Sequence, residues 1–159
     1  MQRIIYSSRA ALTAKPVSLL MREIEIQSAE NNSRDAITGF LVCDGHSFFQ
    51  VLEGNSYSLG RTFERIRSDP RHCDLRIISK HPVSWQEFPG WSMKSWLCTP
   101  ENVQIFMRHG FDNSFDRTIS AEQLLALGRE LHSGSGSSTA ITKRDFCAKL
   151  KMYPGTSRA

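Results

Sequence analysis

Residues 31–54 read NNSRDAITGFLVCDGHSFFQVLEG, and this stretch determines the architecture of the chain. Asp44-Gly45 separates two apolar runs, at residues 37–43 and 47–52. A two-residue Asp-Gly link between such runs is the strongest short-range sequence signal for a β-hairpin. We therefore expect this hairpin at the centre of a β-sheet.

Both faces of the hairpin are apolar. Side chains alternate between the two faces of a strand, so the pattern divides the apolar residues into two sets. One set is Ile37, Leu41, Phe48 and Leu52, and the other is Phe40, Val42, Phe49 and Val51. Other parts of the chain must then cover each face of the sheet.

Gln50 interrupts this apolar pattern. Its neighbours in the same row, Phe48 and Leu52, predict burial, and a buried amide without a partner costs roughly 1–3 kcal/mol. Two interpretations are possible. The amide is satisfied by backbone or by a nearby hydroxyl group, as most buried polar groups are, or it faces a bound polar ligand.

Composition indicates one globular domain with a helical extension. The chain has 159 residues, a net charge of +4 and a pI near 9.0, but its charges form no block of like sign, which makes nucleic acid an unlikely partner. The four cysteines show neither a CxxC nor a zinc-ligand spacing, and we find no secretory signal and no apolar run of about 20 residues. We expect a cytoplasmic protein with reduced thiols, no metal site and no membrane span.

The elements around the hairpin predict an α+β fold. Residues 3–8 and 75–79 read as strands, and residues 16–30 read as an amphipathic helix ended by Asn31-Asn32. A second amphipathic helix starts at Gly54-Asn55-Ser56 and is stopped by Ser68-Asp69-Pro70. The order strand, helix, strand, strand, helix, strand gives a ferredoxin-like βαββαβ sheet. Both crossover helices then cover one face. Residues 91–97 alternate as a fifth strand, which would place Trp91 and Met93 on the same face.

The C-terminal part should supply the cover for the second face. Residues 99–107 read as a short helix capped by Gly110, and Ser120 with Gln123 forms a capping box that begins a helix over 120–132. Ile119 and Leu124 are spaced as a hydrophobic staple, and Leu124, Leu127 and Leu131 mark the buried stripe of that helix. Residues 133–138 have a flexible-linker composition, and a basic amphipathic helix over 142–152 is left open.

Three polar residues should lie close together in this fold. Tyr6 and Gln50 fall on adjacent strands, and Asn32 falls at the end of the first helix. A cleft between the two crossover helices would be lined by all three, which is a hypothesis of a binding site. Spacing alone does not name the ligand.

Several short motifs occur in order between residues 3 and 97. They are Tyr6 with Ser8, Asn31-Asn32, Ile37-Thr38-Gly39, FFQVLEG at 48–54, DPRH at 69–72 and FPGWSM at 88–93. Each motif is weak alone, but together, in order and at compatible distances, they are highly specific. Over these residues the chain resembles the BLUF domain, the family of flavin-binding blue-light sensors. The resemblance implies a flavin-binding domain with a ferredoxin-like fold over residues 1–98. From the residues themselves we expect a helical cap over 99–132 and a flexible linker with a basic tail over 133–159.

The resemblance also implies a cofactor and its photochemistry. It implies FAD, with FMN possible, held without a covalent bond. Tyr6 matches the tyrosine that donates an electron, coupled to a proton, to photoexcited flavin. Gln50 matches the glutamine that bridges this phenol and the flavin N5/C4 carbonyl edge, and its rotation or tautomerisation gives a small red shift. An amide suits this task because it carries a donor and an acceptor on one planar group.

The remaining site residues are assigned by the same likeness. Asn32 matches the asparagine that pairs with the pyrimidine edge of the ring, and Asn31 would lie against the ring or its ribityl arm. Arg65, Asp69 and Arg71 match positions near the C2 side and the ribityl chain. For Arg65 and Arg71 a solvated helix face is the alternative.

Two further matches concern signalling. Trp91 and Met93 match the strand whose register responds to the glutamine in this family, although a Trp and a Met on a sheet face are often plain core. His72 we interpret as a structural cap and not as a ligand.

No stretch after residue 97 resembles an output enzyme. We therefore expect a non-enzymatic photoreceptor whose C-terminal helices pass the signal to a homo-oligomer, as a dimer or ring, or to a separate effector protein.

Three alternatives stay open from the residues themselves. An RRM-type nucleic-acid module needs exposed aromatic residues in a glycine-containing, basic motif, which residues 46–53 lack. A small hydrolase of the acylphosphatase type needs a glycine-rich phosphate loop after the first strand, and none is found there. In a cofactor-free regulatory domain, Gln50 would be only a packed amide.

Overall fold

The computed structural model describes residues 1–11, 15–111 and 118–134. The elements are β1 (Gln2–Ala10), α1 (Val17–Arg34), β2 (Thr38–Cys43), β3 (Ser47–Gly54), α2 (Ser56–Arg67), β4 (His72–Pro82), β5 (Lys94–Leu97), α3 (Val103–Arg108) and α4 (Ala121–Ser133). The linker after residue 134 and the helix considered over 142–152 lie outside the described residues.

The sheet has the predicted ferredoxin-like topology with one added strand. Its order is β4-β1-β3-β2-β5, so β3 with Gln50 is the central strand. β1 runs antiparallel to both β3 and β4, β2 runs antiparallel to β3, and β5 runs parallel to β2. The register places Tyr6 of β1 opposite Gln50 on one side and Leu41 of β2 opposite it on the other.

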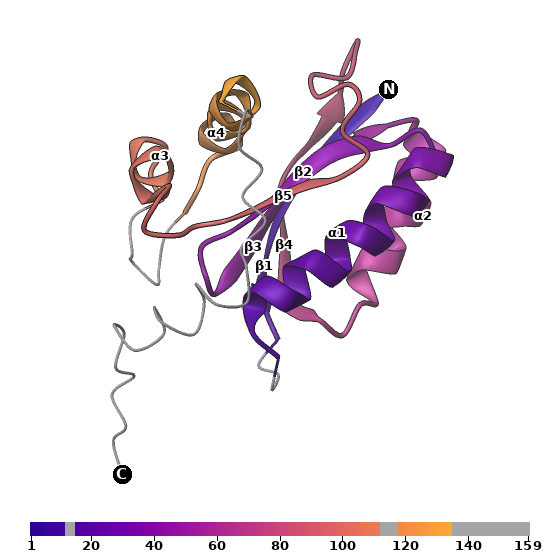
Figure 1. Ribbon diagram of the computed structural model, residues 1–159. Coiled ribbons are helices and arrows are strands. Elements are labelled where there is room, and N and C mark those ends of the chain that lie inside the picture. Colours follow the sequence, from indigo (N-terminus) through magenta and orange to yellow (C-terminus); the bar gives the residue numbers. More distant parts are fainter. Residues whose placement is uncertain (12–14, 112–117, 135–159) are drawn as a thin grey trace.

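Each face of the sheet buries its own core, as the two apolar sets predicted. The helices α1 and α2 lie over one face, and α3 and α4 lie over the other (Figure 1). The α1/α2 face buries Ile37, Leu41, Phe48 and Leu52 together with Ile4 and Leu59. The α3/α4 face buries Phe40, Val42, Phe49 and Val51 together with Phe88 and Leu127.

The hairpin turn lies one residue later than predicted. Gly45 and His46 form its two central residues, because the Asp44 amide donates to the Ser47 carbonyl oxygen. Gly45 has a φ of +105°, which glycine adopts without steric cost. The Asp44 carboxylate accepts hydrogen bonds from the backbone N–H groups of His46 and Ser47, at 2.9 and 2.8 Å, and so fixes the turn.

Helix α1 does not end at Asn31-Asn32, and this prediction was wrong. Both asparagines lie in its last turns, and the chain leaves the helix at Asp35 and at Ala36, whose φ is +53°. The side chain of Asn31 donates to the Gln27 carbonyl oxygen at 2.9 Å, and that of Asn32 donates to the Ser92 carbonyl oxygen at 2.8 Å. Asparagine side chains often disfavour a helix because they bond to nearby backbone groups in place of the helical hydrogen bonds. Here Asn32 bonds outside the helix and Asn31 bonds to a carbonyl group one turn back, so the helix continues past both.

Strand β4 is longer than the predicted residues 75–79. It pairs with β1 along almost all of its length, with two register irregularities. Most of its side chains are exposed or half-buried, as is typical of an edge strand. The sequence pattern therefore indicated only residues 75–79, because the polar residues on either side form a strand only through their pairing with β1.

Trp91 and Met93 lie on opposite faces of the sheet, so the prediction that they share a face was wrong. β5 begins only at Lys94, and the chain bends at Ser92. Alternation of side chains applies to regular strands, and these two residues precede the strand. Trp91 is buried in the α3/α4 core and Met93 in the α1/α2 core.

The C-terminal helices end and begin largely as predicted. α3 is shorter than expected, because residues 99–102 form a turn before it. Gly110 has a φ of +84°, and the N–H groups of Gly110 and Phe111 bond to the carbonyl groups of Met107 and Phe106, which is a Schellman cap. The capping box of Ser120 and Gln123 is confirmed. Among the described residues, no helix is long and apolar enough to cross a membrane.

Candidate functional site

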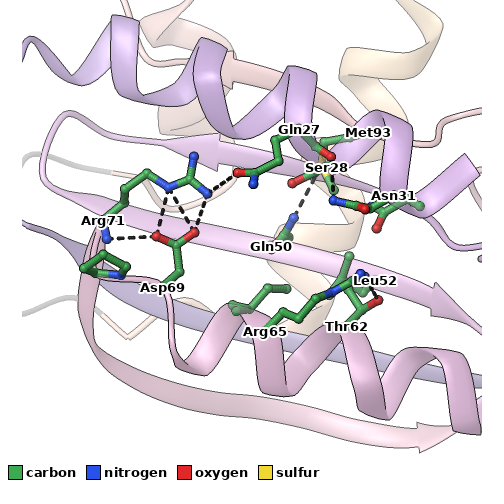
Figure 2. A pocket seen from close by; sticks show the side chains of 13 residues that line it. Gln27, Ser28, Asn31, Gln50, Leu52, Thr62, Arg65, Asp69, Arg71 and Met93 are labelled. Carbon is green, nitrogen blue, oxygen red and sulfur yellow. Dashed lines mark hydrogen bonds and ion pairs between the residues drawn. The ribbon is translucent and has the colours of Figure 1, made fainter.

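A cavity of about 420 Å³ opens between α1 and α2 over the central strand β3 (Figure 2). Helix α1 contributes Asn31 and Asn32, and α2 contributes Arg65. Gln50 lies at its floor. The full lining is Gln27, Ser28, Asn31, Asn32, Gln50, Leu52, Thr62, Arg65, Ile66, Asp69, Pro70, Arg71 and Met93. The fold therefore brings together all predicted site residues except Tyr6 and Trp91 around one cavity.

Tyr6 lies immediately behind this cavity. It borders a smaller void of about 30 Å³ that shares Gln50, Ser28 and Asp69 with the main cavity. The phenol of Tyr6 is 3% exposed and packs edge-on against Phe63. Burial raises the pKa of Tyr6 far above its ordinary value, and the nearby Asp69 carboxylate raises it further. The phenol therefore stays protonated at every physiological pH.

Gln50 connects Tyr6 to Met93 through both ends of its amide. The Tyr6 hydroxyl donates to Gln50 Oε1, and Gln50 Nε2 donates to Met93 Sδ at 3.3 Å. This pairing results from the sheet, because antiparallel register places Tyr6 directly opposite Gln50. The amide anticipated from the sequence is thus buried and hydrogen-bonded by two other side chains.

Asn31 and Asn32 occupy different depths at the end of α1. Asn32 is 2% exposed, and its bond to the Ser92 carbonyl oxygen ties α1 to the segment that carries Met93. Asn31 lies nearer the surface, where its Oδ1 accepts from Arg34 at 3.3 Å. Consecutive helical residues point about 100° apart, so one amide reaches the interior while the other borders the mouth.

Asp69 and Arg71 form a rigid ion pair at the other end of the cavity. Arg71 Nε contacts both carboxylate oxygens, at 2.8 and 2.9 Å, and the Arg71 backbone N–H donates at 2.9 Å. Burial acts to raise the pKa of Asp69, but the bonds from Arg71 outweigh it, and the pKa lies below its usual value. Arg71 also donates to Gln27 of α1 at 2.7 Å and so bridges the cavity mouth (Figure 2).

Arg65 lies at the rim and not in the floor. Its guanidinium donates to the Thr62 hydroxyl at 2.6 Å and contacts Asp35 at 3.3 Å. Its side chain lines the cavity and is also 43% exposed to solvent.

The comparisons with known proteins agree with this arrangement. The family described as "BLUF: Sensors of blue-light using FAD" matches residues 1–94, which is more than half of the chain. The chain belongs to the BLUF family. The family uses flavin to sense blue light, and these residues form its BLUF domain.

The individual relatives and solved structures are identical to this chain at only about a quarter of the aligned residues. The β subunit of photoactivated adenylate cyclase from Euglena gracilis is 27% identical over 94 residues, which cover 59% of this chain and 11% of that protein. The chain therefore matches only about a tenth of the length of such curated relatives. The photo-activated state of BlsA superposes with a TM-score of 0.73 at 23% identity, covering 87% of this chain and 99% of BlsA. The dark-state structure of the BLUF protein BlrB gives 0.67 at 26%, covering 83% and 95%.

The residues of this BLUF domain fit a flavin. The cavity volume lies within the range of small-molecule sites, about 300–1,000 Å³. Leu52, Ile66 and Met93 provide apolar surface for a flat ring, and amide groups of Asn31 and Gln50 offer donors and acceptors at its edges. The cavity is not filled by aliphatic side chains.

Trp91 does not line the cavity. Its indole packs on the α3/α4 face, with its ring centroid 4.6 Å from that of His132 in α4. His72, interpreted from the sequence as a structural cap, borders the smaller void and forms a 2.9 Å hydrogen bond with Ser8. Burial lowers the pKa of His72 below its ordinary value of 6.5.

Sequence reasoning missed three cavity residues on the helices. Gln27, Ser28 and Thr62 all line the cavity, but polar residues on an amphipathic helix are usually solvated. The spacing of Gln27 to Asn31, four residues on one helix face, was the available signal.

Proposed function

We propose that this chain is a blue-light photoreceptor in which Tyr6 and Gln50 carry the photochemistry. The observation that carries this proposal is the continuous chain of contacts from Tyr6 through Gln50 to Met93, beside a cavity of the right size for flavin. FAD held there without a covalent bond supplies absorption of blue light and an electron acceptor; FMN would supply the same chemistry. The protein residues supply the electron, the proton and the switch.

Tyr6 is suited to lose an electron and a proton together. Its raised pKa keeps the phenol protonated before light, and a phenol becomes strongly acidic only when oxidised. The Gln50 Oε1 atom is the hydrogen-bond acceptor already in place for that proton. The negative charge of Asp69 nearby favours positive charge at Tyr6.

Gln50 is suited to act as the switch because its two contacts are not equivalent. Reversal of the amide would present Nε2 to the Tyr6 oxygen and Oε1 to Met93. The Met93 sulfur is only an acceptor, so it accepts from Nε2 but has no proton for Oε1. Amide reversal therefore removes the Met93 contact, and the orientation of Gln50 is transmitted to the segment before β5.

The other cavity residues would hold and tune the ring. We propose that Asn32 pairs with the pyrimidine edge and that Asn31 lies against the ring or the ribityl arm. Arg65 and the Asp69–Arg71 pair would bind near the C2 side and the ribityl chain. A guanidinium there stabilises negative charge that develops on reduction.

We propose that the signal leaves through Met93, Trp91 and the helices α3 and α4. The short segment from Trp91 to Met93 crosses from one face of the sheet to the other, which supports this path. The chain itself would have no enzymatic activity and would act on a homo-oligomer, a dimer or ring, or on a separate effector protein. We place it in the cytoplasm, which the free thiols of Cys43 and Cys73 support.

A light-regulated enzyme subunit is the second candidate. Several relatives are named as photoactivated adenylate cyclase subunits of Euglena gracilis. In such an assembly the BLUF domain would keep the same switch, and the output would be catalytic.

Absorption spectroscopy of the purified protein tests the proposal. We expect flavin bands and a small, reversible red shift after blue light that decays in the dark. Tyr6→Phe should retain the flavin and lose the normal cycle, because the O–H group is the proposed source of both electron and proton. Colourless protein that FAD does not reconstitute, or a normal cycle in Tyr6→Phe, would refute it. Incubation of the protein with ATP in light and in the dark tests the second candidate, and conversion of ATP that depends on light would support it.

A further inference from the structure

Four charged residues from distant parts of the sequence form one network on the α3/α4 side of the sheet. They are Arg3 of β1, Glu53 of β3, Glu87 of the β4–β5 loop (residues 83–93) and Arg129 of α4. None of them lines the flavin cavity. The network connects the sheet, the loop that leads to Met93, and the C-terminal helix.

The inner half of the network is a fixed anchor. Glu53 is fully buried and Arg3 is 8% exposed. One Glu53 oxygen accepts from Arg3 at 2.7 Å, and the other accepts from the backbone N–H groups of Glu87 and Phe88 at 2.8 and 3.3 Å. Charge-assisted bonds of this kind are strong when buried, so the middle of the loop stays attached to the sheet at Glu87 and Phe88.

The outer half is much weaker. Glu87 accepts from Arg3 at 2.7 Å through one oxygen and from Arg129 at 2.5 Å through the other. The Arg129 side chain is 56% exposed, and exposed ion pairs contribute little and are screened by salt. The Glu87–Arg129 contact is therefore the part of the network that a small change in the loop can open.

Helix α4 meets the same loop at two further points. A Cβ added to Gly128 would lie 2.4 Å from Phe40 and 3.1 Å from Phe88, so the helix packs closely on the loop's Phe88. The His132 ring packs edge-on against Trp91. A displacement of the loop between Glu87 and Trp91 must therefore change how α4 is seated.

We infer that the Glu87–Arg129 ion pair is a latch that holds α4 on the β4–β5 loop in the dark and opens on illumination. This inference rests on the proposed function for the light-driven step only. Loss of the Gln50–Met93 contact would loosen the loop between Phe88 and Met93, while Glu53 still holds the backbone of Glu87 and Phe88. The Glu87–Arg129 side-chain pair, which joins this half of the loop to α4, then opens first, and α4 becomes available to a partner.

Hydrogen exchange measured by mass spectrometry, in dark and in light, tests the latch. In the dark, Arg129→Gln should raise exchange of the 85–91 backbone by about two- to fivefold, the loss expected for an exposed ion pair. Arg129→Lys should restore most of the protection. Arg108→Gln is the matched control, because Arg108 is 57% exposed and pairs with Glu130 between α3 and α4 without touching the loop.

In light, wild-type exchange over 85–91 should rise to the level that Arg129→Gln shows in the dark. Equal dark exchange in Arg129→Gln and Arg108→Gln would overturn the latch, and so would unchanged loop exchange in illuminated protein whose flavin bands do shift. Absence of any light-induced absorption shift would refute the photoreceptor proposal instead. The comparison of Arg129→Gln with Arg108→Gln in the dark would still decide whether the ion pair holds the loop.

Discussion

Replacement of Glu53 by Gln tests whether the buried carboxylate organises the α3/α4 side of the sheet. Glu53 has no exposed surface and accepts hydrogen bonds from Arg3, Glu87 and Phe88. Removing one partner of a buried ion pair costs about 3–5 kcal/mol. Because Arg3 keeps Glu87 as a second carboxylate, we expect the lower end, about 3 kcal/mol.

Thermal unfolding followed by circular dichroism in the dark measures this loss. For a domain of this size, each kcal/mol lowers Tm by about 2–4 °C, so the expected decrease is about 6–12 °C. Glu64→Gln is the control, since Glu64 is exposed and pairs with Arg67 on the same helix, and its loss should stay within about 1 kcal/mol. A Glu53→Gln protein as stable as the control would show that the network does not stabilise the fold.

Three further predictions concern the site and the strands around it. Met93→Leu should keep the flavin and slow dark recovery about two- to fivefold in time-resolved absorption, because the resting orientation of Gln50 loses a weak hydrogen bond; unchanged recovery would contradict the role of this contact. Gly39→Ala should lower stability by at least about 3 kcal/mol in denaturant unfolding, since the new Cβ would lie 1.9 Å from the Val51 carbonyl oxygen; a stable variant would contradict the observed strand approach. Burial lowers the pKa of His72 in the folded protein, so as the pH falls below about 6.5 the unfolded chain binds this proton first and the folded state loses stability. In His72→Gln the decrease in Tm between pH 7 and 5 should therefore be smaller than in the wild type. An equal decrease in both proteins would refute the lowered pKa of His72.

The hairpin, the two-sided core and the helix caps could be predicted because local sequence determines them. Apolar alternation over residues 37–52 assigned each side chain to a face, and the capping box at Ser120 needs only residues three positions apart. The ferredoxin-like order could be inferred from the succession of elements. These features depend little on distant parts of the chain.

Other features depended on tertiary contacts and were missed or wrong. The extent of β4 is set by pairing with β1, and the opposite faces of Trp91 and Met93 result from a bend at Ser92. The Arg3–Glu53–Glu87–Arg129 network joins residues up to 126 positions apart (129 − 3), which no local pattern indicates.

Only part of the candidate site could be predicted from the sequence. The buried amide of Gln50 was evident from its apolar row, and its proximity to Tyr6 could be inferred from the topology. The ligand and the individual roles came from family resemblance, because the amide and phenol groups are chemically compatible with many polar ligands.

The light-minus-dark absorption spectrum of Gln50→Leu, recorded beside wild type with the flavin content of each, is the sharpest test of Gln50 as the light-driven switch. We expect equal flavin content, a reversible red shift in the wild-type protein and none in the variant, since leucine fills similar space but offers neither donor nor acceptor. A red shift of normal size in Gln50→Leu would contradict the assignment of the switch to this amide.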